Sequence, residues 1–373
     1  MTRTRVAIIF GGRSSEHAIS CATAAGVLTA IDRDRFDVVP IGIARDGSWL
    51  LLPDDPAPLR LDGTRLPEIV AAEHPAVVLP FGAERGRVIV APATEAARVL
   101  EGVDVVLPLL HGPFGEDGTL QGLLELTDLP YVGSGVLASA AGMDKHVMKV
   151  LLAGAGVPVG PYTVIPRTSW ERDRAAALDA VAALSDVVFV KPARAGSSMG
   201  ITRVVRSADD GDAALVAAIE EARRHDPKVI VESAIDGREI EVAVLGGRGL
   251  DAPRTTAPGE IVVGGDHAFY DFEAKYTGTD TTSLEVPASL ATHVADAARE
   301  MAAQAFEALG CEGLARVDLF ATGTGLVVNE VNTMPGFTPF SMFPSLWANE
   351  GLAYPELITE LIELALERPT GLR

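Results

Sequence analysis

The sequence is poor in cysteine and in positive charge, and it contains no long apolar segment. Its two cysteines, Cys21 and Cys311, lie too far apart for a disulfide framework or for zinc-ligand spacing. The apolar run from Val6 to Phe10 is shorter than the core of a signal peptide and ends in Gly-Gly. No stretch approaches the length of a transmembrane helix. We therefore expect a soluble protein of the cytoplasm with no membrane partner.

Positive charge is outweighed throughout, because 31 Lys and Arg residues oppose 51 Asp and Glu residues, for a net charge of -20. This balance argues against a nucleic-acid backbone or an anionic membrane surface as a partner. The chain has 373 residues, of which 48% are hydrophobic. That length and composition favour two or three domains with a substantial core.

Strands and helices alternate over the first third of the chain. RVAIIF (5–10) has the pattern of a buried strand, ISCATAAGVLTAI (19–31) that of a helix, and FDVVPIGIA (36–44) that of a second strand. Such alternation predicts an α/β domain built on a mostly parallel sheet. Binding groups then gather at the carboxyl ends of the strands. The loops GGRSSEH (11–17) and HGPFGEDG (111–118) occupy such positions.

Two further changes of pattern divide the rest of the chain. A new unit begins near Met143, and from about Arg238 strands of β-branched residues dominate. The stretch 264–287 is polar, contains glycine and is long for a connection within a compact domain. We therefore expect it to be a functional loop.

GLARVDLF (313–320) and GLVVNEVN (325–332) are two strands joined by a short turn. If Phe320 pairs with Leu326, Arg316 faces Glu330, and alternation places four polar side chains on one face: Arg316, Asp318, Glu330 and Asn332. Asp318 then lies diagonally from Glu330. Two carboxylates and an amide oxygen suit Mg²⁺ with nucleotide phosphates. A solvated hairpin face with Arg316 paired to Glu330 is the alternative.

Lys191 ends the apolar strand VVFVKP and precedes the glycine-rich loop ARAGSSMG (193–200). Glycines let backbone N–H groups approach phosphate oxygens, and a lysine at the end of a strand adds a positive charge. The loop is not a P-loop, because G-x-x-x-x-G-K-[ST] does not occur in the chain. An ordinary flexible loop would show the same composition.

Two weaker signals lie in the first third. The run from Gly133 to Ala138 matches G-x-G-x-x-A, but no acidic residue follows about 20 residues later, so we expect a tight turn between strand and helix. Glu16 and His17 lie on one loop after a strand, and His111, Glu116 and Asp117 lie on another. They could form a small polar pocket, although each histidine could equally be a turn residue bonded to local backbone.

Together these segments resemble the D-alanine–D-alanine ligases of the ATP-grasp superfamily over nearly the whole chain. The motifs that carry the resemblance are FGGRSSEHAIS, LPLLHGPFGEDGTLQG, YVGSG, MDK, VKPARAGSSMG, FYDFEAKY, RVDLF and NEVNTMPGFTPFSMFP. The resemblance implies a three-domain ATP-grasp fold, α/β at the N-terminus and α+β in the rest. The expected domains are an N-terminal α/β substrate-binding domain (1–141), a central ATP-grasp subdomain (142–236) and a C-terminal subdomain with the closing loop (237–373).

The family reaction joins two D-alanines through an acyl phosphate made with ATP, for peptidoglycan synthesis. The resemblance implies two Mg²⁺ ions, for which Mn²⁺ can substitute, held by Asp318, Glu330 and Asn332. The residues that it implies for ATP are Lys145, Lys191, Ser197, Ser198, Glu232, Ile235, Glu239, Phe269, Lys275, Asn329 and Glu330. Those that it implies for catalysis are Glu16, Ser197, Tyr276, Arg316 and Gly336. Those that it implies for the substrate are Glu16, His111, Lys275, Arg316, Gly336 and Ser341.

Three other functions compete with this one. Relatives that use D-lactate or D-serine as second substrate share most motifs, but the pair Lys275–Tyr276 favours the dipeptide. A binding module that has lost its chemistry should lack metal ligands, and a Rossmann dehydrogenase needs the missing acidic residue. The expected partners are D-alanine and ATP, and the family implies a homodimer.

Overall fold

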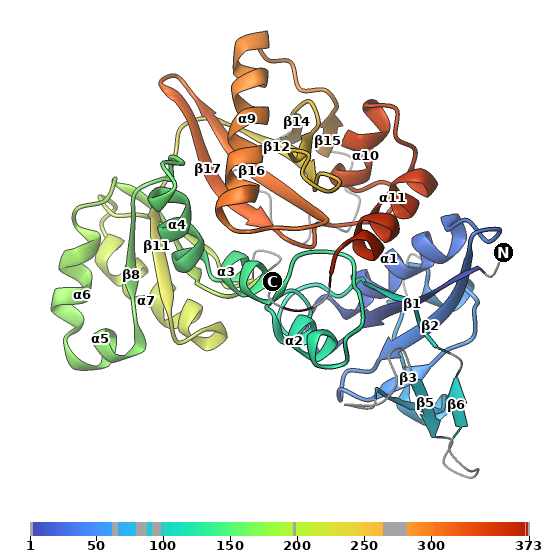
Figure 1. The fold of residues 1–373 in the computed structure, drawn as a ribbon. Helices are drawn as coiled ribbons and strands as arrows, with labels where there is room; N and C mark the ends of the chain where they lie inside the picture. The colour runs from blue at the N-terminus through green and yellow to red at the C-terminus, as the bar shows by residue number, and fades with distance from the viewer. Residues whose placement is uncertain are drawn as a thin grey trace.

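The computed structural model describes residues 3–61, 66–79, 88–91, 98–100, 102–196, 199–263, 282–369 and 371. Three β-sheets follow one another along this part of the chain, and helices flank each of them (Figure 1). None of the described helices is both long enough and apolar enough to cross a membrane.

The first sheet has seven strands and is mixed, whereas the sequence predicted a mostly parallel sheet. Parallel pairing joins β1 to β2 and to β7, and all other pairs in this sheet are antiparallel. Parallel strands need a crossover helix, and α1 (His17–Ala30) supplies one between β1 and β2. The sheet order is β6-β5-β4-β3-β2-β1-β7, with bounds β1 Thr4–Gly11, β2 Phe36–Ile43, β3 Trp49–Leu51, β4 Ala76–Val78, β5 Val88–Ala91, β6 Arg98–Leu100 and β7 Val105–Pro108.

Three helices lead from the first sheet to the second. Gly133 adopts a φ of +101°, and Gly135 is the N-cap of the following helix. The expected tight turn between strand and helix is therefore confirmed at this glycine pair, since a φ in this range favours glycine. The helices are α2 (Thr119–Leu126), α3 (Val136–Met143) and α4 (Lys145–Gly154).

The second sheet has four strands in the order β10-β9-β11-β8, all of them antiparallel. Its core contains Trp170, Val190 and Ile219, so helices from both sides of β9 in sequence pack against the sheet. The strands are β8 Tyr162–Ile165, β9 Val187–Pro192, β10 Thr202–Val205 and β11 Val229–Ser233, and the helices are α5 Arg167–Arg172, α6 Arg174–Val181 and α7 Gly211–His225.

The third sheet is antiparallel, and α9 packs against it through Ala298, Ala302 and Ala305. Its order is β15-β14-β12-β16-β17, and β13 pairs with β12. β17 therefore forms one edge of the sheet, beside β16. The elements are β12 Arg238–Leu245, β13 Arg254–Thr255, β14 Gly259–Val263, β15 Thr282–Glu285, α9 Thr292–Ala308, β16 Leu314–Thr322 and β17 Gly325–Asn332.

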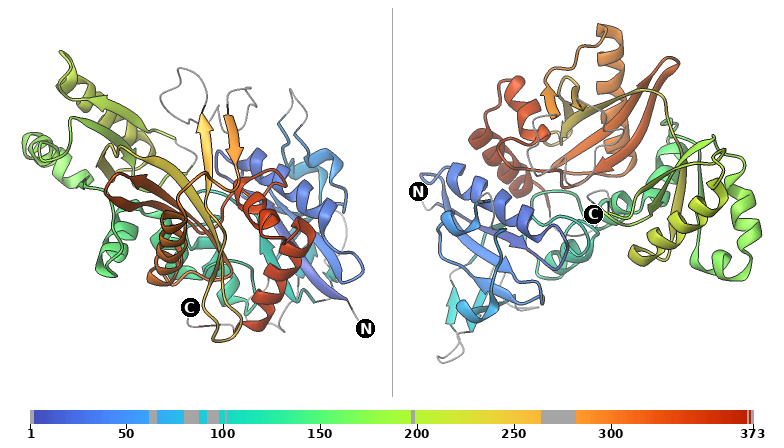
Figure 2. Two further views of the ribbon diagram at one scale, coloured as in Figure 1. Left: turned by 90° about the horizontal axis from the view of Figure 1, so that it is seen from above. Right: turned by 180° about the vertical axis from the view of Figure 1, so that it is seen from behind.

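Of the last two helices, α11 (Tyr354–Glu367) packs against α1 and β7 of the first part of the chain, and α10 (Met342–Asn349) packs against β12 and α11. Phe10, Leu107, Phe343 and Leu361 belong to one buried cluster. Figures 1 and 2 both show α11 beside α1. The three sheets fall within the three predicted domain ranges, but this shared core joins the two ends of the chain. The domain boundaries stay a prediction.

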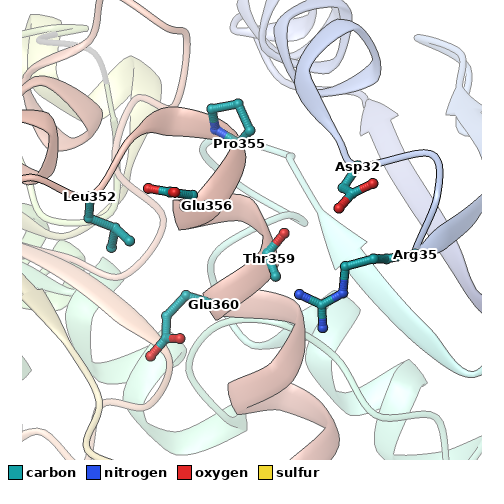
Figure 3. Close-up of a pocket in the computed structure, with 7 residues that line it drawn as sticks. All are labelled: Asp32, Arg35, Leu352, Pro355, Glu356, Thr359 and Glu360. Carbon is teal, nitrogen blue, oxygen red and sulfur yellow. The ribbon is translucent and has the colours of Figure 1, made fainter.

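A surface hollow of about 310 Å³ lies where α11 meets the chain that follows α1 (Figure 3). Its lining residues are Asp32, Arg35, Leu352, Pro355, Glu356, Thr359 and Glu360. No predicted site residue is among them, so the hollow lies away from the candidate site.

Candidate active site

The hairpin of β16 and β17 brings its polar residues onto one face through a register that differs from the predicted one. Thr322 pairs with Gly325, and the register then shifts between Leu319 and Asp318. Asp318 lies directly opposite Glu330 instead of diagonally, and Arg316 lies opposite Asn332 instead of Glu330. The pairing at the turn is shifted by one residue from the predicted register, which alone would turn the side chains of β17 to the other face. The β-bulge at Asn329 shifts the pairing by one residue more, so Asp318 and Glu330 share a face as predicted.

Arg316 forms ion pairs with Asp318 and Glu241. Its Nε lies 2.7 Å from Asp318 Oδ1 and 3.0 Å from Glu241 Oε2, and one terminal nitrogen lies 2.7 Å from Asp318 Oδ2. Burial lowers the pKa of Arg316, but Asp318 and Glu241 together raise it well above its usual value. Asp318 is 3% exposed. The face is therefore no solvated hairpin surface, and Arg316 stays charged.

The two carboxylates of the predicted metal site have further contacts. Asn332 donates its Nδ2 to Asp318 Oδ2 at 3.0 Å, so its amide oxygen is the atom that can bind a cation. Glu330 Oε2 lies 3.2 Å from Lys145 Nζ. The described residues contain no group of three His, Cys, Asp or Glu side chains suited to a metal. Two carboxylates and one amide oxygen are nevertheless a fitting set for Mg²⁺, which binds through few protein oxygens.

Three lysines surround two glutamates beside the glycine-rich loop, and we call Lys145, Lys149 and Lys191 the lysine cluster. Lys191 ends β9, and its Nζ lies 2.5 Å from Glu232 Oε2 at the end of β11. Lys149 Nζ lies 2.8 Å from Glu232 Oε1. Lys145 donates to the backbone oxygen of Ala195 at 3.4 Å, besides its contact with Glu330. The cluster thus joins the second sheet, the third sheet and the loop.

Glu232 is held ionised by this cluster. Burial alone would raise its pKa, but Lys191 and Lys149 lower it to about 2. Burial likewise lowers the pKa of Lys191, yet Glu232 reverses that effect and raises it. Both groups therefore carry charge at neutral pH.

Glu16, His111 and Glu116 gather beside Gly196 of the same loop, and we call them the acid cluster. Glu16 stands at the N-cap of α1 without a capping hydrogen bond, and it is 7% exposed. Gly112 donates its backbone N–H to Glu116 Oε1 at 2.7 Å. A methyl group on Gly196 would lie 2.9 Å from Glu16 Oε2, so the glycine-rich loop reaches this cluster. The loops 11–17 and 111–118, which were predicted to share a sheet edge, do meet, since Ser14 donates its hydroxyl to the backbone oxygen of His111 at 2.8 Å.

The acid cluster shifts two pKa values. Burial, reinforced by the charge of Glu16, raises the pKa of Glu116 to about 8. Burial lowers the pKa of His111, against the opposing effects of Glu16 and of a hydrogen bond to the backbone of Met334. The Nε2 atom of His111 is buried and has no hydrogen-bond partner within the described chain. His111 is thus a neutral imidazole beside Glu16 and Glu116.

Ser341 and Tyr354 contact the turn that follows β17. A methyl group on Gly336 would lie 3.3 Å from Ser341 Oγ, and Thr338 donates its backbone N–H to that oxygen at 3.1 Å. Tyr354 donates its hydroxyl to the backbone oxygen of Phe337 at 2.8 Å. The two predicted residues of this turn, Gly336 and Ser341, are thus neighbours.

Several predicted residues lie elsewhere or outside the described chain. Ile235 follows β11, and its Cδ1 would lie 2.7 Å from a methyl group on Gly160. Glu239 lies on β12 and contributes to the raised pKa of Lys191, which places it near the lysine cluster. The predicted residues that lie outside the described ones are Ser197, Ser198, Phe269, Lys275 and Tyr276, with most of the predicted closing loop (264–287).

Sequence reasoning missed Lys149 and Glu241. Lys149 follows Lys145 by one helical turn, so i,i+4 spacing on α4 was the available signal. Glu241 follows Glu239 by two residues on β12, and β12 pairs with β16 so that Glu241 lies opposite Asp318. That pairing between distant strands leaves no local trace in the sequence.

The arrangement of the three sheets is that of an ATP-grasp enzyme. The D-ala D-ala ligase N-terminus family matches residues 5–134, and the D-ala D-ala ligase C-terminus family matches residues 151–363. The chain belongs to the D-alanine–D-alanine ligase family.

Relatives and solved structures are similar over almost their full lengths. The chain is 57% identical to a D-alanine–D-alanine ligase of Pseudarthrobacter chlorophenolicus, covering 100% of this chain and 96% of that one. It is 58% identical to one of Kineococcus radiotolerans, covering 100% and 99%. The solved D-Ala:D-Ser ligase VanG of Enterococcus faecalis is 36% identical with a TM-score of 0.82, covering 98% of this chain and 100% of VanG. The solved D-alanine–D-alanine ligase of Coxiella burnetii is 33% identical with a TM-score of 0.80, covering 99% and 95%.

Proposed function

We propose that this chain joins two D-alanines into D-alanyl-D-alanine at the expense of ATP. The observation that carries the proposal is the meeting of the lysine cluster and the acid cluster at the glycine-rich loop. The lysines, suited to phosphates, reach the loop at Ala195, and Glu16, suited to an ammonium group, lies beside Gly196. Two relatives more than half identical over the whole chain carry the name of this ligase.

The first step transfers the γ-phosphoryl group of ATP to the carboxylate of the first D-alanine, giving an acyl phosphate and ADP. Lys145 and Lys191 would hold the phosphates, and Glu16 would pair with the ammonium group of that D-alanine. The buried Nε2 of His111 is available to the same substrate. Glu232, Ile235, Glu239 and Asn329 would bind the rest of the nucleotide.

In the second step the amine of the second D-alanine attacks the carbonyl carbon of the acyl phosphate. The carbon–nitrogen bond forms, the carbon–oxygen bond to phosphate breaks with its electron pair leaving on the phosphate, and the proton lost by the amine balances on the released phosphate. Arg316 and the backbone N–H of Gly336 would stabilise the negative oxygen of the tetrahedral intermediate, because a charged donor pre-placed by Asp318 and Glu241 needs no reorganisation. Ser341 and Lys275 would hold the carboxylate of the second D-alanine.

We further propose that Asp318, Glu330 and Asn332 hold two Mg²⁺ ions, or Mn²⁺ in their place. When bound, the ions would neutralise charge on the transferring phosphoryl group. The direct pairing of Asp318 with Glu330 and the amide oxygen of Asn332 support this assignment. Ser197, Ser198, Phe269 and Tyr276 complete the proposed site, with Tyr276 and the closing loop excluding water from the acyl phosphate.

Location and assembly are also proposals. Both cysteines are free and buried, which supports the reducing cytoplasm as the compartment. A homodimer is the assembly implied by the family. Sedimentation at micromolar concentration should give twice the chain mass of 39.0 kDa. A single species with the mass of one chain would contradict the dimer.

The test is a competition experiment with pure protein, ATP, Mg²⁺, D-alanine and an equal concentration of D-lactate or D-serine at neutral pH. The proposal expects ATP-dependent phosphate release with D-alanyl-D-alanine as the main product. Equal or greater yield of the D-lactate or D-serine product would mean that the chain is a ligase for that second substrate. Absence of all three products would overturn the ligase function.

A further inference from the structure

Helix α4 presents two lysines to the proposed nucleotide site, and the second has no role in the reaction described above. Lys145 contacts Glu330 at 3.2 Å. Lys149, one turn later, contacts Glu232 at 2.8 Å and donates to the backbone oxygen of Asn329 at 3.4 Å. One side chain therefore touches both sheets that would enclose the nucleotide, the second through Glu232 and the third through Asn329.

The contact with Asn329 falls on the β-bulge of β17. This bulge decides that Glu330, rather than Asn329, lies opposite Asp318. β17 is an edge strand, and α4 and the segment after it satisfy its outer side. Val328 donates its N–H to the Pro158 oxygen at 2.9 Å, and Val331 donates its N–H to the Met148 sulfur at 3.3 Å. Lys149 binds between these two contacts.

The charge of Lys149 also has a specific partner. Lys149 is 2% exposed, and a buried ammonium group is unfavourable unless it is paired. Glu232 is shared, since Lys191 also lies 2.5 Å from it. When Lys191 turns towards a phosphate, Glu232 keeps Lys149 as a counterion and does not become an isolated buried charge.

The composition of the chain supports a specific role. Of the 31 Lys and Arg residues only five are lysines: Lys145, Lys149, Lys191, Lys228 and Lys275. Basic side chains elsewhere are arginines. Two of the other lysines belong to the lysine cluster, so Lys149 is not one of many surface cations.

We propose that Lys149 is a positioning residue for the nucleotide, which keeps Glu232 in place and holds the bulge that turns Glu330 towards Asp318. The inference rests on the proposed function, because it takes the site between the two sheets to bind ATP. Lys149 itself acts through Glu232 and the backbone of Asn329, and it need not touch the substrate.

The test measures binding of ADP with Mg²⁺ to Lys149→Met by titration calorimetry, together with KM for ATP and for D-alanine. Met keeps the length of the side chain and removes the charge and both hydrogen bonds. We expect the Kd for ADP and the KM for ATP to rise roughly ten- to hundredfold, because a buried carboxylate loses one of its two counterions. KM for D-alanine at saturating ATP should change by less than about threefold. Lys149→Arg should recover part of the affinity.

Lys228→Met is the matched control, since Lys228 also anchors α4, by an ion pair with the N-cap residue Asp144. An equal rise of Kd in both variants would overturn the inference and leave only a general effect on α4. Unchanged ADP affinity in Lys149→Met would overturn it as well. Should that variant not fold, Lys149→Gln carries the same expectation and the same contrary outcomes.

The wild-type chain separates this inference from the proposed function. Wild-type protein that binds ADP but makes no dipeptide would overturn the ligase function, and the ADP titrations would still decide on Lys149. Wild-type protein that binds neither ADP nor ATP would overturn both.

Discussion

Glu232 of the lysine cluster and Glu116 of the acid cluster have opposite pKa shifts. Burial raises the pKa of each, but Lys191 and Lys149 lower that of Glu232 to about 2. The charge of Glu16 acts in the same direction as burial on Glu116, whose pKa rises to about 8. The same residue type therefore carries a charge on one side and a proton on the other.

The difference follows from the neighbours rather than from the depth of burial. Glu232 has two lysines as counterions, Lys149 and Lys191, so one of them can turn to a phosphate while the other stays paired. In the acid cluster Glu116 is protonated and His111 is neutral, so the charge of Glu16 remains for an ammonium group. Two sites of opposite sign thus meet at Gly196, and each of the following changes acts on one side or on their junction.

Lys191→Met acts on the lysine cluster and should have the largest effect. It removes the fixed charge at the end of β9 and one counterion of Glu232. We expect kcat/KM for ATP to fall by about 10³-fold or more, the size typical of removing a group that stabilises the transition state. KM for D-alanine should hardly change. Steady-state kinetics with each substrate varied in turn measures both values. A fall of less than about tenfold would show that phosphates bind elsewhere.

Glu16→Gln acts on the acid cluster and should have the next largest effect. The amide keeps the shape of the side chain but cannot balance the ammonium group of the first D-alanine. We expect kcat/KM for D-alanine to fall by about 10²-fold, as for the loss of a buried ion pair. Glu68→Gln, an exposed glutamate near Arg45, is the control and should match wild type. A change confined to KM for ATP would contradict the assignment of the two sides.

Gly196→Ala acts on the junction. Its methyl group would lie 2.9 Å from Glu16 Oε2, so the carboxylate or the loop must move. We expect both KM values to rise by several-fold up to about tenfold, because both clusters border this residue. Gly154→Ala, at a position with open space around it, should leave both values unchanged. An effect on one KM alone would mean that the loop belongs to one side only.

Glu116→Gln should have the smallest effect, and on stability rather than on binding. The folded pKa of Glu116, about 8, lies above its usual value of 4.5. Its contribution to stability is therefore complete below about pH 4.5 and is lost as the pH rises towards 8. Urea unfolding from pH 4.5 to 8 should show a smaller fall in stability for the variant than for wild type. Parallel curves over this range would mean that Glu116 titrates normally.

The sequence predicted the polar face of the hairpin better than it predicted the hairpin itself. Asp318 and Glu330 share a face as expected, although the predicted register was wrong, because the turn and the bulge each shift the pairing by one. Alternation reports which side of a strand a residue lies on, and two compensating shifts preserve it. The bulge depends on contacts with α4, which no local pattern encodes.

Other features could not be predicted for a similar reason. The antiparallel strands that extend the first sheet, β3 to β6, have only three or four residues each, too few for a clear alternation. Packing of α11 against α1 joins residues more than 300 positions apart. Glu241 acquires its role only when β12 pairs with β16, which places it opposite Asp318. Local motifs therefore located the loops, Lys145 and Lys191, whereas the contacts of Lys149 and Glu241 came from the tertiary fold.

The most direct test of the two-sided site is a calorimetric titration of ADP with Mg²⁺ into wild type, Lys191→Met and Glu16→Gln. If cations on one side of Gly196 bind the nucleotide and carboxylates on the other bind D-alanine, Glu16→Gln should bind ADP as wild type does. Lys191→Met should lose most of its affinity for ADP. Equal loss in both variants, or loss in Glu16→Gln alone, would contradict the account.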